Sequence, residues 1–492
     1  MMEIIQTILL ISVFVVMALM MFLRVIPALI ALPLMAILIA LFGGVSFHDT
    51  IQFVIGEGSL KLFTAYTIAM FGSMLSVILQ KTGVAESFIK RGAELAGDNP
   101  WIIGIIMLSL ITMLFTTLGG LGAIIMVATI VLPIMASVGL GPMTTVGIFL
   151  LGLSIGGTLN VGNWAVYIDV MGLSVSEIRP FALIMFGISF IAAIIYLTIQ
   201  IYRDGQDINL KRIIIVSSSL FGIVAALFIS YSYLVTESQK IFIDKSFSYL
   251  GTGISYLIGS LILILFVIAL IRALKNKNEL ESEVHWTSYF SPIIPLFLIL
   301  LFDIHFIAAF IIGLFYAFVS TYKKGRLNLF IQSIFEGGGV VMPAVVLMFG
   351  IGMLLVAIMG PGIQLEQYPN GWPVINLLQP LLTEIVPQSG LSYVLIFTLL
   401  APLALYRGPL NVWGMGYGLA AVFLASGLNP GAVMGLLLAV GQIQGISDPT
   451  NTHNVWLANE MRVDVQKVLW NTIPYTWALA FLGLVFAALM FM

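Results

Sequence analysis

The chain contains no cysteine among its 492 residues, and charged residues make up only 9% of it. The absence of cysteine excludes disulfides, thiolate metal sites and thiol redox chemistry, although it does not fix the compartment. Soluble domains carry about 25% charged residues, whereas 60% of this chain is hydrophobic and its mean hydropathy is +1.12. A soluble protein of this composition could not cover its surface with polar groups, so the sequence predicts a protein that is solvated by lipid.

Several functional signatures are also missing. The net charge is −2, so no basic surface argues for nucleic acid as a partner. The sequence has no metal-ligand cluster, phosphate-binding loop or nucleophile elbow. We therefore expect no enzyme activity, no catalytic residues, no metal site and no cofactor, with Na⁺ considered only as a coupling ion. The N-terminal segment lacks a basic leader and a cleavage site, and we interpret it as a retained first span.

Long apolar runs are abundant. A bilayer core requires about 20 apolar residues per helix, and twelve runs reach or approach that length. They lie at 4–23, 26–44, 62–80, 143–170, 181–202, 213–234, 249–272, 287–302, 304–320, 338–359, 431–457 and 472–492. The predicted fold class is an all-α polytopic membrane protein with about 12 transmembrane helices and two re-entrant hairpins.

The two hairpins are predicted where an apolar stretch has a polar or glycine-rich middle. In the stretch 100–140 the middle is 116–120, with the sequence Thr-Thr-Leu-Gly-Gly, and in the stretch 391–428 it is 406–409, with the sequence Tyr-Arg-Gly-Pro. Irregular backbone at membrane depth is tolerated only where it is buried in protein or lines a cavity. Both hairpin tips are therefore candidate sites.

The two hairpin regions align without a gap at an offset of 288 residues. At this offset the matches fall on glycine, proline and asparagine at breaks, such as Gly120 with Gly408 and Asn163 with Asn451. The number of predicted crossings between the first span and its partner is odd, so the repeats are predicted to be inverted. The predicted organisation is a first inverted repeat at 1–205 (hairpin 100–140, broken helix 143–170), two linking transmembrane helices at 206–286, and a second inverted repeat at 287–492 (hairpin 391–428, broken helix 431–457).

The distribution of basic residues gives an orientation. When the predicted spans are threaded through a bilayer, most of the 20 Lys and Arg residues fall on one face. The positive-inside rule makes that face cytoplasmic. The sequence thus predicts a multi-pass protein of the cell inner (plasma) membrane with both termini extracytoplasmic.

Two of the predicted spans are interrupted by polar runs, at 156–163 and at 445–454. Unsatisfied polar groups in hydrocarbon cost several kcal/mol, so such runs are expected to face a polar ligand. Asn and Thr oxygens with freed carbonyls can coordinate a cation, and half-helix N-termini can hold a carboxylate. The alternative is a kink whose polar groups are satisfied by neighbouring helices.

Arg407 and Asp448 are the charged residues of these regions. An arginine at membrane depth is costly, and its guanidinium matches a carboxylate at two points, so Arg407 is a candidate for anion recognition. Alternatively it reaches the external face or pairs with Asp448. Asp448 could carry a proton or help to bind Na⁺, or it could form a fixed salt bridge with Arg407; Na⁺ held by Asn163, Asn451 and backbone carbonyls is an equal alternative.

The segment Asn451-Thr-His-Asn-Val-Trp-Leu457, followed by Val463, resembles the late Asn-Asp-Pro-Gly-Phe-Trp-Leu segment of gluconate permeases. With the two hairpin-plus-broken-helix repeats, the chain resembles the ion transporter superfamily, most closely its gluconate permease and citrate symporter families. The resemblance implies a homodimer with a scaffold and a moving transport unit. The first tip differs from the Ser-Asn-Thr tips of the sodium-coupled dicarboxylate branch. Carried over to this chain, the candidate substrate-binding residues are Thr117, Gly119, Gly120, Asn160, Asn163, Arg407, Gly408, Asn411, Thr450, Asn451 and Thr452, and the ion-coupling residues are Asp448, Asn163 and Asn451.

The function predicted from the sequence is secondary active transport of a small organic anion, a carboxylate such as citrate, gluconate or a dicarboxylate, coupled to H⁺ or Na⁺. The alternative is a Na⁺/H⁺-type cation antiporter of the same superfamily, which would favour acidic residues where Arg407 stands. A membrane-embedded enzyme is a third class, for which no catalytic constellation is visible. The expected partners are the carboxylate substrate, the lipid bilayer and a second copy of the chain.

Overall fold

The computed structural model describes residues 2–23, 25–97, 99–205, 237–275, 284–323, 325–412 and 416–492. All regular structure in these ranges is helical, which confirms the predicted all-α class. Seven of the described helical segments are long and apolar enough to cross a membrane, or eight if one bent pair counts as a single span. The predicted span 213–234 lies outside the described residues, and the one at 287–302 is formed by two short helices, the longer of nine residues.

The described helices follow one another with short connections. In chain order they are α1 (Met2–Phe22), α2 (Ala28–Phe42), α3 (Phe47–Asp49), η1 (Thr50–Glu57), α4 (Gly58–Leu60), α5 (Phe63–Lys81), α6 (Val84–Ala96), α7 (Pro100–Phe115), α8 (Leu121–Ser137), α9 (Pro142–Thr158), α10 (Val161–Met171), α11 (Val175–Arg203), α13 (Glu237–Lys275), η3 (Trp286–Phe290), α14 (Ile294–Phe302), α15 (Phe306–Ser320), α16 (Leu327–Met359), α17 (Pro373–Ile385), α18 (Gly390–Leu400), η4 (Ala401–Arg407), α19 (Tyr417–Ala425), α20 (Pro430–Ser447), α21 (Thr452–Glu460) and α22 (Val465–Phe491).

Proline and asparagine mark the starts of several helices in the sequence. α7 and α20 each begin at a proline that follows an asparagine, and the side chain of Asn99 accepts hydrogen bonds from the backbone N–H groups of the first turn of α7. Proline at the first helical position loses no hydrogen bond, and its fixed φ suits a helix. An asparagine cap satisfies N–H groups that a helix leaves open. The Asn-Pro pairs therefore set the starts of α7 and α20.

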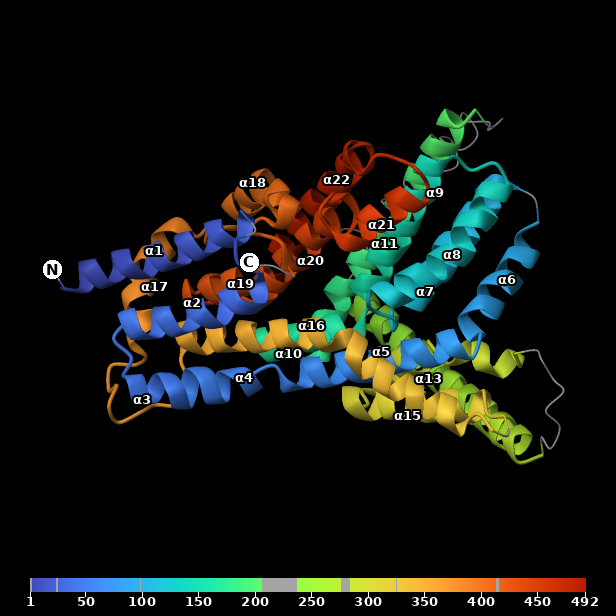
Figure 1. The fold of residues 1–492 in the computed structure, drawn as a ribbon, viewed down its shortest axis with the longest axis horizontal. Helices are drawn as coiled ribbons and strands as arrows, with labels where there is room; N and C mark the ends of the chain where they lie inside the picture. Colours follow the sequence, from blue (N-terminus) through green and yellow to red (C-terminus); the bar gives the residue numbers. More distant parts are fainter. Residues whose placement is uncertain are drawn as a thin grey trace.

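α5 and α16 cross in antiparallel fashion at the centre of the molecule (Figure 1), and glycines allow the close approach. A Cβ atom on Gly337 of α16 would lie 2.5 Å from the Cα atom of Met74 on α5. Near the opposite end of α16, a Cβ atom on Gly350 would lie 2.9 Å from Leu32 on α2. On α5, a Cβ atom on Gly72 would lie 3.3 Å from Phe310 on α15. The four helices thus form one packed scaffold.

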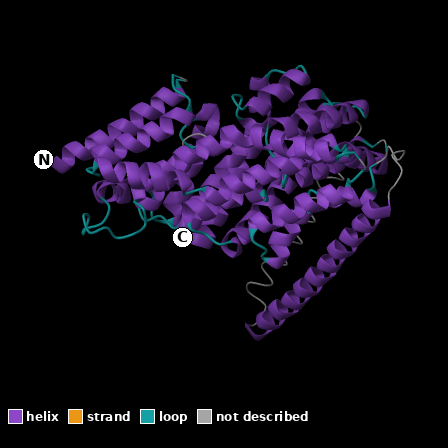
Figure 2. Cartoon of the chain, turned by 60° about the horizontal axis from the view of Figure 1, so that its bottom comes forward, coloured by secondary structure: helices purple, strands orange, loops and turns teal. Residues whose placement is uncertain are grey.

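The periphery is apolar and largely uncovered by protein. Figure 2 shows α13 as a long helix that leaves the body of the molecule, and its exposed side chains include Leu257, Leu263 and Ile264. α1 likewise exposes Ile4, Ile8 and other large apolar side chains. Such surfaces suit contact with lipid chains, in agreement with a multi-pass membrane protein.

The two predicted hairpins are both pairs of helices that turn back. α7 and α8 lie side by side and meet at a tip formed by 116–120 (Figure 1). In the second hairpin, α18 passes into the 3₁₀ helix η4, whose end bears Tyr406 with a φ of 54°, and α19 begins after the tip. A left-handed tyrosine is uncommon, and it shapes the second tip differently from the first.

Candidate functional site

Both broken helices break inside the predicted polar runs. α9 and α10 are bent by 47° at Leu159 and Asn160, whereas α20 and α21 continue as one span, Pro430–Glu460, around a four-residue interruption that begins at Asp448. A helix that ends inside a protein leaves its last carbonyl groups without intrahelical partners. The partners of these groups therefore show what the breaks can bind.

Amide and ring N–H groups cover the carbonyls at the ends of α9 and α20. The Nδ2 atom of Asn163 lies 2.9 Å from the Gly157 oxygen, and the Nδ2 atom of Asn451 lies 2.6 Å from the Gln444 oxygen. Further carbonyls accept hydrogen bonds from the Trp164 indole (2.8 Å, Thr158) and the Asn454 amide (3.1 Å, Ile446), and the His453 ring lies 3.3 Å from the Gly445 oxygen. The negative ends of both helices are thus largely occupied by protein donors.

Asn160 connects the first break to the first hairpin tip. Its Nδ2 atom donates to the carbonyl oxygens of Phe115, at 2.9 Å, and Leu118, at 3.3 Å. Its Oδ1 atom accepts a hydrogen bond of 2.9 Å from the N–H of Gly162 and so caps α10. One side chain therefore holds the end of α7 and the start of α10 together.

Asp448 connects the second break to the second hairpin tip. It is completely buried, and its Oδ1 atom accepts hydrogen bonds from the N–H of Tyr406 at 3.0 Å and from the N–H and hydroxyl of Thr450 at 2.9 and 2.7 Å. Its Oδ2 atom lies 3.3 Å from the Nδ2 atom of Asn411, which also donates to Ala404. A buried carboxylate with this many donors is well satisfied as a charge.

The two broken helices also contact each other. The hydroxyl of Ser154 on α9 donates a 2.9 Å hydrogen bond to Oε1 of Gln442 on α20. One turn away, a Cβ atom on Gly445 would lie 3.0 Å from the same hydroxyl. The Oε1 atom of Gln444 accepts a hydrogen bond from the N–H of Val412 after the second tip. These contacts place the two breaks side by side.

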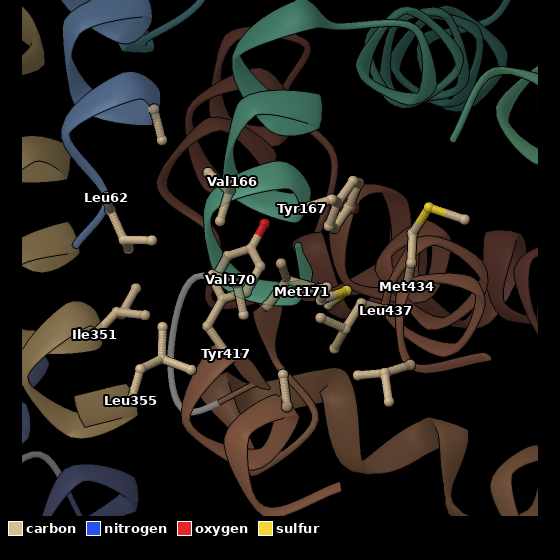
Figure 3. Close-up of a cluster of buried hydrophobic side chains, with 14 of the residues drawn as sticks. Leu62, Val166, Tyr167, Val170, Met171, Ile351, Leu355, Tyr417, Met434 and Leu437 are labelled. Carbon is tan, nitrogen blue, oxygen red and sulfur yellow. The ribbon is translucent and has the colours of Figure 1, made fainter. Parts of the chain in front are cut away.

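A cavity of about 510 Å³ lies where the breaks, the first hairpin tip and the scaffold meet. None of its described wall residues is Asp, Glu, Lys or Arg. Beside it, Tyr167 of α10 and Tyr417 of α19 approach each other within an apolar cluster (Figure 3). The polar side chains of the described wall are Ser73, Thr117, Ser154, Thr158, Asn160, Asn163, Tyr167, Tyr417, Gln442, Gln444, Asn451, Thr452 and His453.

Three helices begin at this cavity. The wall includes Gly120 and Leu121 at the start of α8, Gly162 at the start of α10, and Thr452 at the start of α21. The N-cap positions of α8 and α21 make no side-chain capping hydrogen bond. A helix N-terminus carries roughly half a positive elementary charge and presents N–H groups. The cavity therefore has an electropositive side although its described wall has no Lys or Arg.

The structure brings many of the residues predicted from the sequence to this cavity and leaves others away from it. Gly408, Asn411, Thr450 and Asp448 belong to the hydrogen-bonded second tip and do not line the cavity. Arg407 ends η4, and its side chain lies outside the described part of the structure. The predicted residues that line the cavity are Thr117, Gly119, Gly120, Asn160, Asn163, Asn451 and Thr452.

Sequence reasoning missed six polar side chains of the wall, Ser73, Ser154, Tyr167, Tyr417, Gln442 and Gln444. Ser154 and Gln442 are related by the same 288-residue offset that aligned the two hairpins. Both are polar residues within otherwise apolar helices. A search of the aligned repeats for polar residues at corresponding helical positions would have found this pair.

Comparison with known proteins gives a likeness to solved structures alone. No family model and no curated protein matches the chain. The crystal structure of the Alcanivorax borkumensis YdaH transporter, which has an unusual topology, is similar with a TM-score of 0.48 and 13% sequence identity, over 88% of this chain and 86% of that one. A likeness of this degree identifies neither a family nor a function, so the resemblance to the ion transporter superfamily stays a prediction.

Proposed function

We propose that the protein is a secondary active transporter of a small organic anion of the carboxylate class. The observation that carries this proposal is the polarity of the cavity. Three helix N-termini reach it, and those of α8 and α21 have no side-chain cap, while the carbonyl ends of α9 and α20 are covered by Asn163, Asn451 and neighbouring donors. Positive helix ends that are free of side-chain caps favour an anion.

The same polarity weighs against a cation antiporter. Such a protein needs a carboxylate that faces the ion path, and the described cavity wall contains neither Asp nor Glu. Asp448, the acidic residue inside a break, accepts hydrogen bonds from Tyr406, Thr450 and Asn411 behind the wall. The coupling ion is proposed to be H⁺ or Na⁺. Asp448, Asn163 and Asn451 stay the predicted coupling residues.

We also propose that the chain consists of two inverted repeats. The close contact between Gly72 and Phe310 has a counterpart between Gly350 and Leu32. Adding 278 to the numbers of Gly72 and Leu32 gives those of Gly350 and Phe310, so one contact maps onto the other. A two-fold relation between the halves accounts for such reciprocal contacts. The proposed homodimer rests on the family resemblance, and the proposed extracytoplasmic location of both termini rests on the distribution of basic residues.

Two glycines at the first tip allow the proposal to be tested. A Cβ atom on Gly119 or on Gly122 would meet no atom within 4 Å, and neither residue has a positive φ. Gly119 lines the cavity, whereas Gly122 does not. Valine is therefore expected to fit at both positions without disturbing the fold, but only at position 119 would it occupy space that a ligand needs.

The experiment measures thermal stabilisation of the purified protein by a panel of carboxylates, with and without Na⁺. A ligand at 100 times its Kd stabilises the folded state by about 2.7 kcal/mol. We expect at least one carboxylate to raise the Tm of the wild-type protein and of Gly122→Val but not of Gly119→Val. Stabilisation by Na⁺ alone, with no carboxylate active, would favour the antiporter instead.

A further inference from the structure

One side of the cavity is built almost entirely from apolar side chains. α16 contributes two valines, Ala344 and Met348, and α15 contributes Phe310. Of the wall residues on α5, Ser73 alone is polar. Hydrogen bonds to a ligand on this side are therefore scarce within the described wall.

The polar groups gather in another part of the wall, at the breaks. Ser154, Gln442, Asn163 and Asn451 belong to α9, α20, α10 and the second break respectively, and the N-termini of α10 and α21 lie in the same part of the wall. A ligand that spans the cavity thus meets hydrogen-bond donors at one end and hydrocarbon at the other.

The size of the cavity makes this division relevant for selectivity. Pockets of about 300–1,000 Å³ hold drug-sized ligands, and the cavity measures about 510 Å³. A carboxylate group would fill only a small part of it. The body of the ligand must then contact the scaffold wall, where a second carboxylate or a row of hydroxyls would lose its water without gaining partners.

We infer that the preferred substrate is an amphipathic monocarboxylate, with its carboxylate at the helix breaks and an apolar body against α5, α15 and α16. This inference rests on the proposed function and narrows its substrate class. It disfavours citrate, gluconate and short dicarboxylates, whose polar groups extend over the whole molecule. Binding energy would come mainly from burial of the apolar body, and the carboxylate would set its orientation.

The test is a binding series with radiolabelled butyrate, hexanoate and octanoate on the immobilised full-length protein, with citrate and gluconate as polar competitors. Each buried methylene contributes about 0.8 kcal/mol, so affinity should rise about fourfold per methylene and about 200-fold from butyrate to octanoate. Citrate and gluconate should compete weakly. 1-Octanol, which matches octanoate in its body but lacks the charge, should compete far less well than octanoate.

A pair of variants on α16 localises the apolar body. Ala344 lines the cavity, whereas Val346 is exposed elsewhere on the same helix. Ala344→Phe should weaken octanoate binding by about 15-fold or more, because the ring takes the room of at least two methylenes, and should leave butyrate binding unchanged. Val346→Phe should change neither, which also controls for partition of the longer acids into detergent.

The outcomes separate the inference from the proposed function. If citrate or gluconate binds more tightly than octanoate, the amphipathic preference is wrong and the anion transporter stands. If 1-octanol competes as well as octanoate, or if no acid binds, the anion proposal fails and this inference fails with it. If Ala344→Phe does not fold, the wild-type chain-length series and the 1-octanol comparison still test whether the protein prefers amphipathic monocarboxylates.

Discussion

The two junctions between hairpin and broken helix use corresponding residues with opposite hydrogen-bond polarity. Asn160 and Asp448 stand 288 residues apart in the sequence. Asn160 donates to the carbonyls of Phe115 and Leu118 at the first tip, whereas Asp448 accepts from the N–H of Tyr406 at the second. Leu118 and Tyr406 are separated by the same offset. The residue at this position thus binds a backbone carbonyl of the tip in the first half and a backbone N–H of the tip in the second half.

The tips differ in another respect that bears on binding. At the offset of 288, Gly119 corresponds to Arg407, so the first tip has a glycine where the second has an arginine. The first tip lines the cavity, and the second is tied to Asp448 behind it. Under the proposed repeat, the first tip forms part of an open wall, whereas the corresponding second tip is a fixed structure that carries one arginine.

The strongest test of this comparison is the removal of Arg407. If it recognises the anion, Arg407→Ala should eliminate binding, because truncating one partner of a buried charge pair costs about 2–5 kcal/mol, or roughly 30- to 4,000-fold in affinity. Arg407→Lys should weaken binding, because an ammonium cannot replace a two-point contact. Radioligand binding measures both effects.

The control for Arg407 is the amount of monodisperse protein in detergent. If Arg407 has a purely structural role, Arg407→Ala should reduce the amount of monodisperse protein. If Arg407 recognises the anion, that amount should stay the same. Unchanged affinity in Arg407→Ala would assign anion recognition to the helix N-termini alone.

The second test exchanges polarity at the second tip. Asp448→Asn places an amide N–H against the Nδ2 group of Asn411 or the N–H of Tyr406, so donors face donors in a buried site. A buried group left unsatisfied costs about 1–3 kcal/mol, and the Tm should fall accordingly. The double variant Asn411→Asp with Asp448→Asn restores a donor–acceptor pair and should recover part of the loss.

The same variant addresses coupling. If Asp448 exchanges a proton during transport, Asp448→Asn should abolish uphill accumulation in proteoliposomes and leave some counterflow. Full accumulation by folded Asp448→Asn protein would make Asp448 a structural residue.

The third test concerns the contact between the two breaks. Ser154→Ala leaves Oε1 of Gln442 without its hydroxyl donor. A hydrogen bond of this kind contributes about 0.5–1.5 kcal/mol, so a modest fall in Tm is expected. In a double-mutant cycle with Gln442→Leu, the two effects should not add. Additive effects would show that the pair contributes nothing to the alignment of the breaks.

Much of the fold was predictable because lipid imposes strong rules on sequence. Apolar runs predicted the helices, and Asn-Pro pairs marked starts such as those at Pro100 and Pro430. The polar runs predicted both breaks. The direction in which each polar side chain points was not predictable, because a break interrupts the helical periodicity that assigns residues to faces. Asp448 accordingly looked like a cavity residue, but it lies behind the wall, whereas Gln442 lies in it.

The test with the smallest expected effect on stability or activity concerns the inverted topology itself. The chain contains no cysteine, so single cysteines can be introduced without background. Asn370 and Glu94 are both exposed, in the loop before α17 and on α6 respectively. The odd number of predicted crossings puts these segments on opposite faces, so Asn370→Cys should react with an impermeant thiol reagent from outside intact cells. Glu94→Cys should react only after the membrane is opened.

Neither change should alter the Tm, since both side chains lie at the surface. Equal labelling of both from one side would mean that the halves are not inverted, and the correspondence between Asn160 and Asp448 would then have to arise without a two-fold relation.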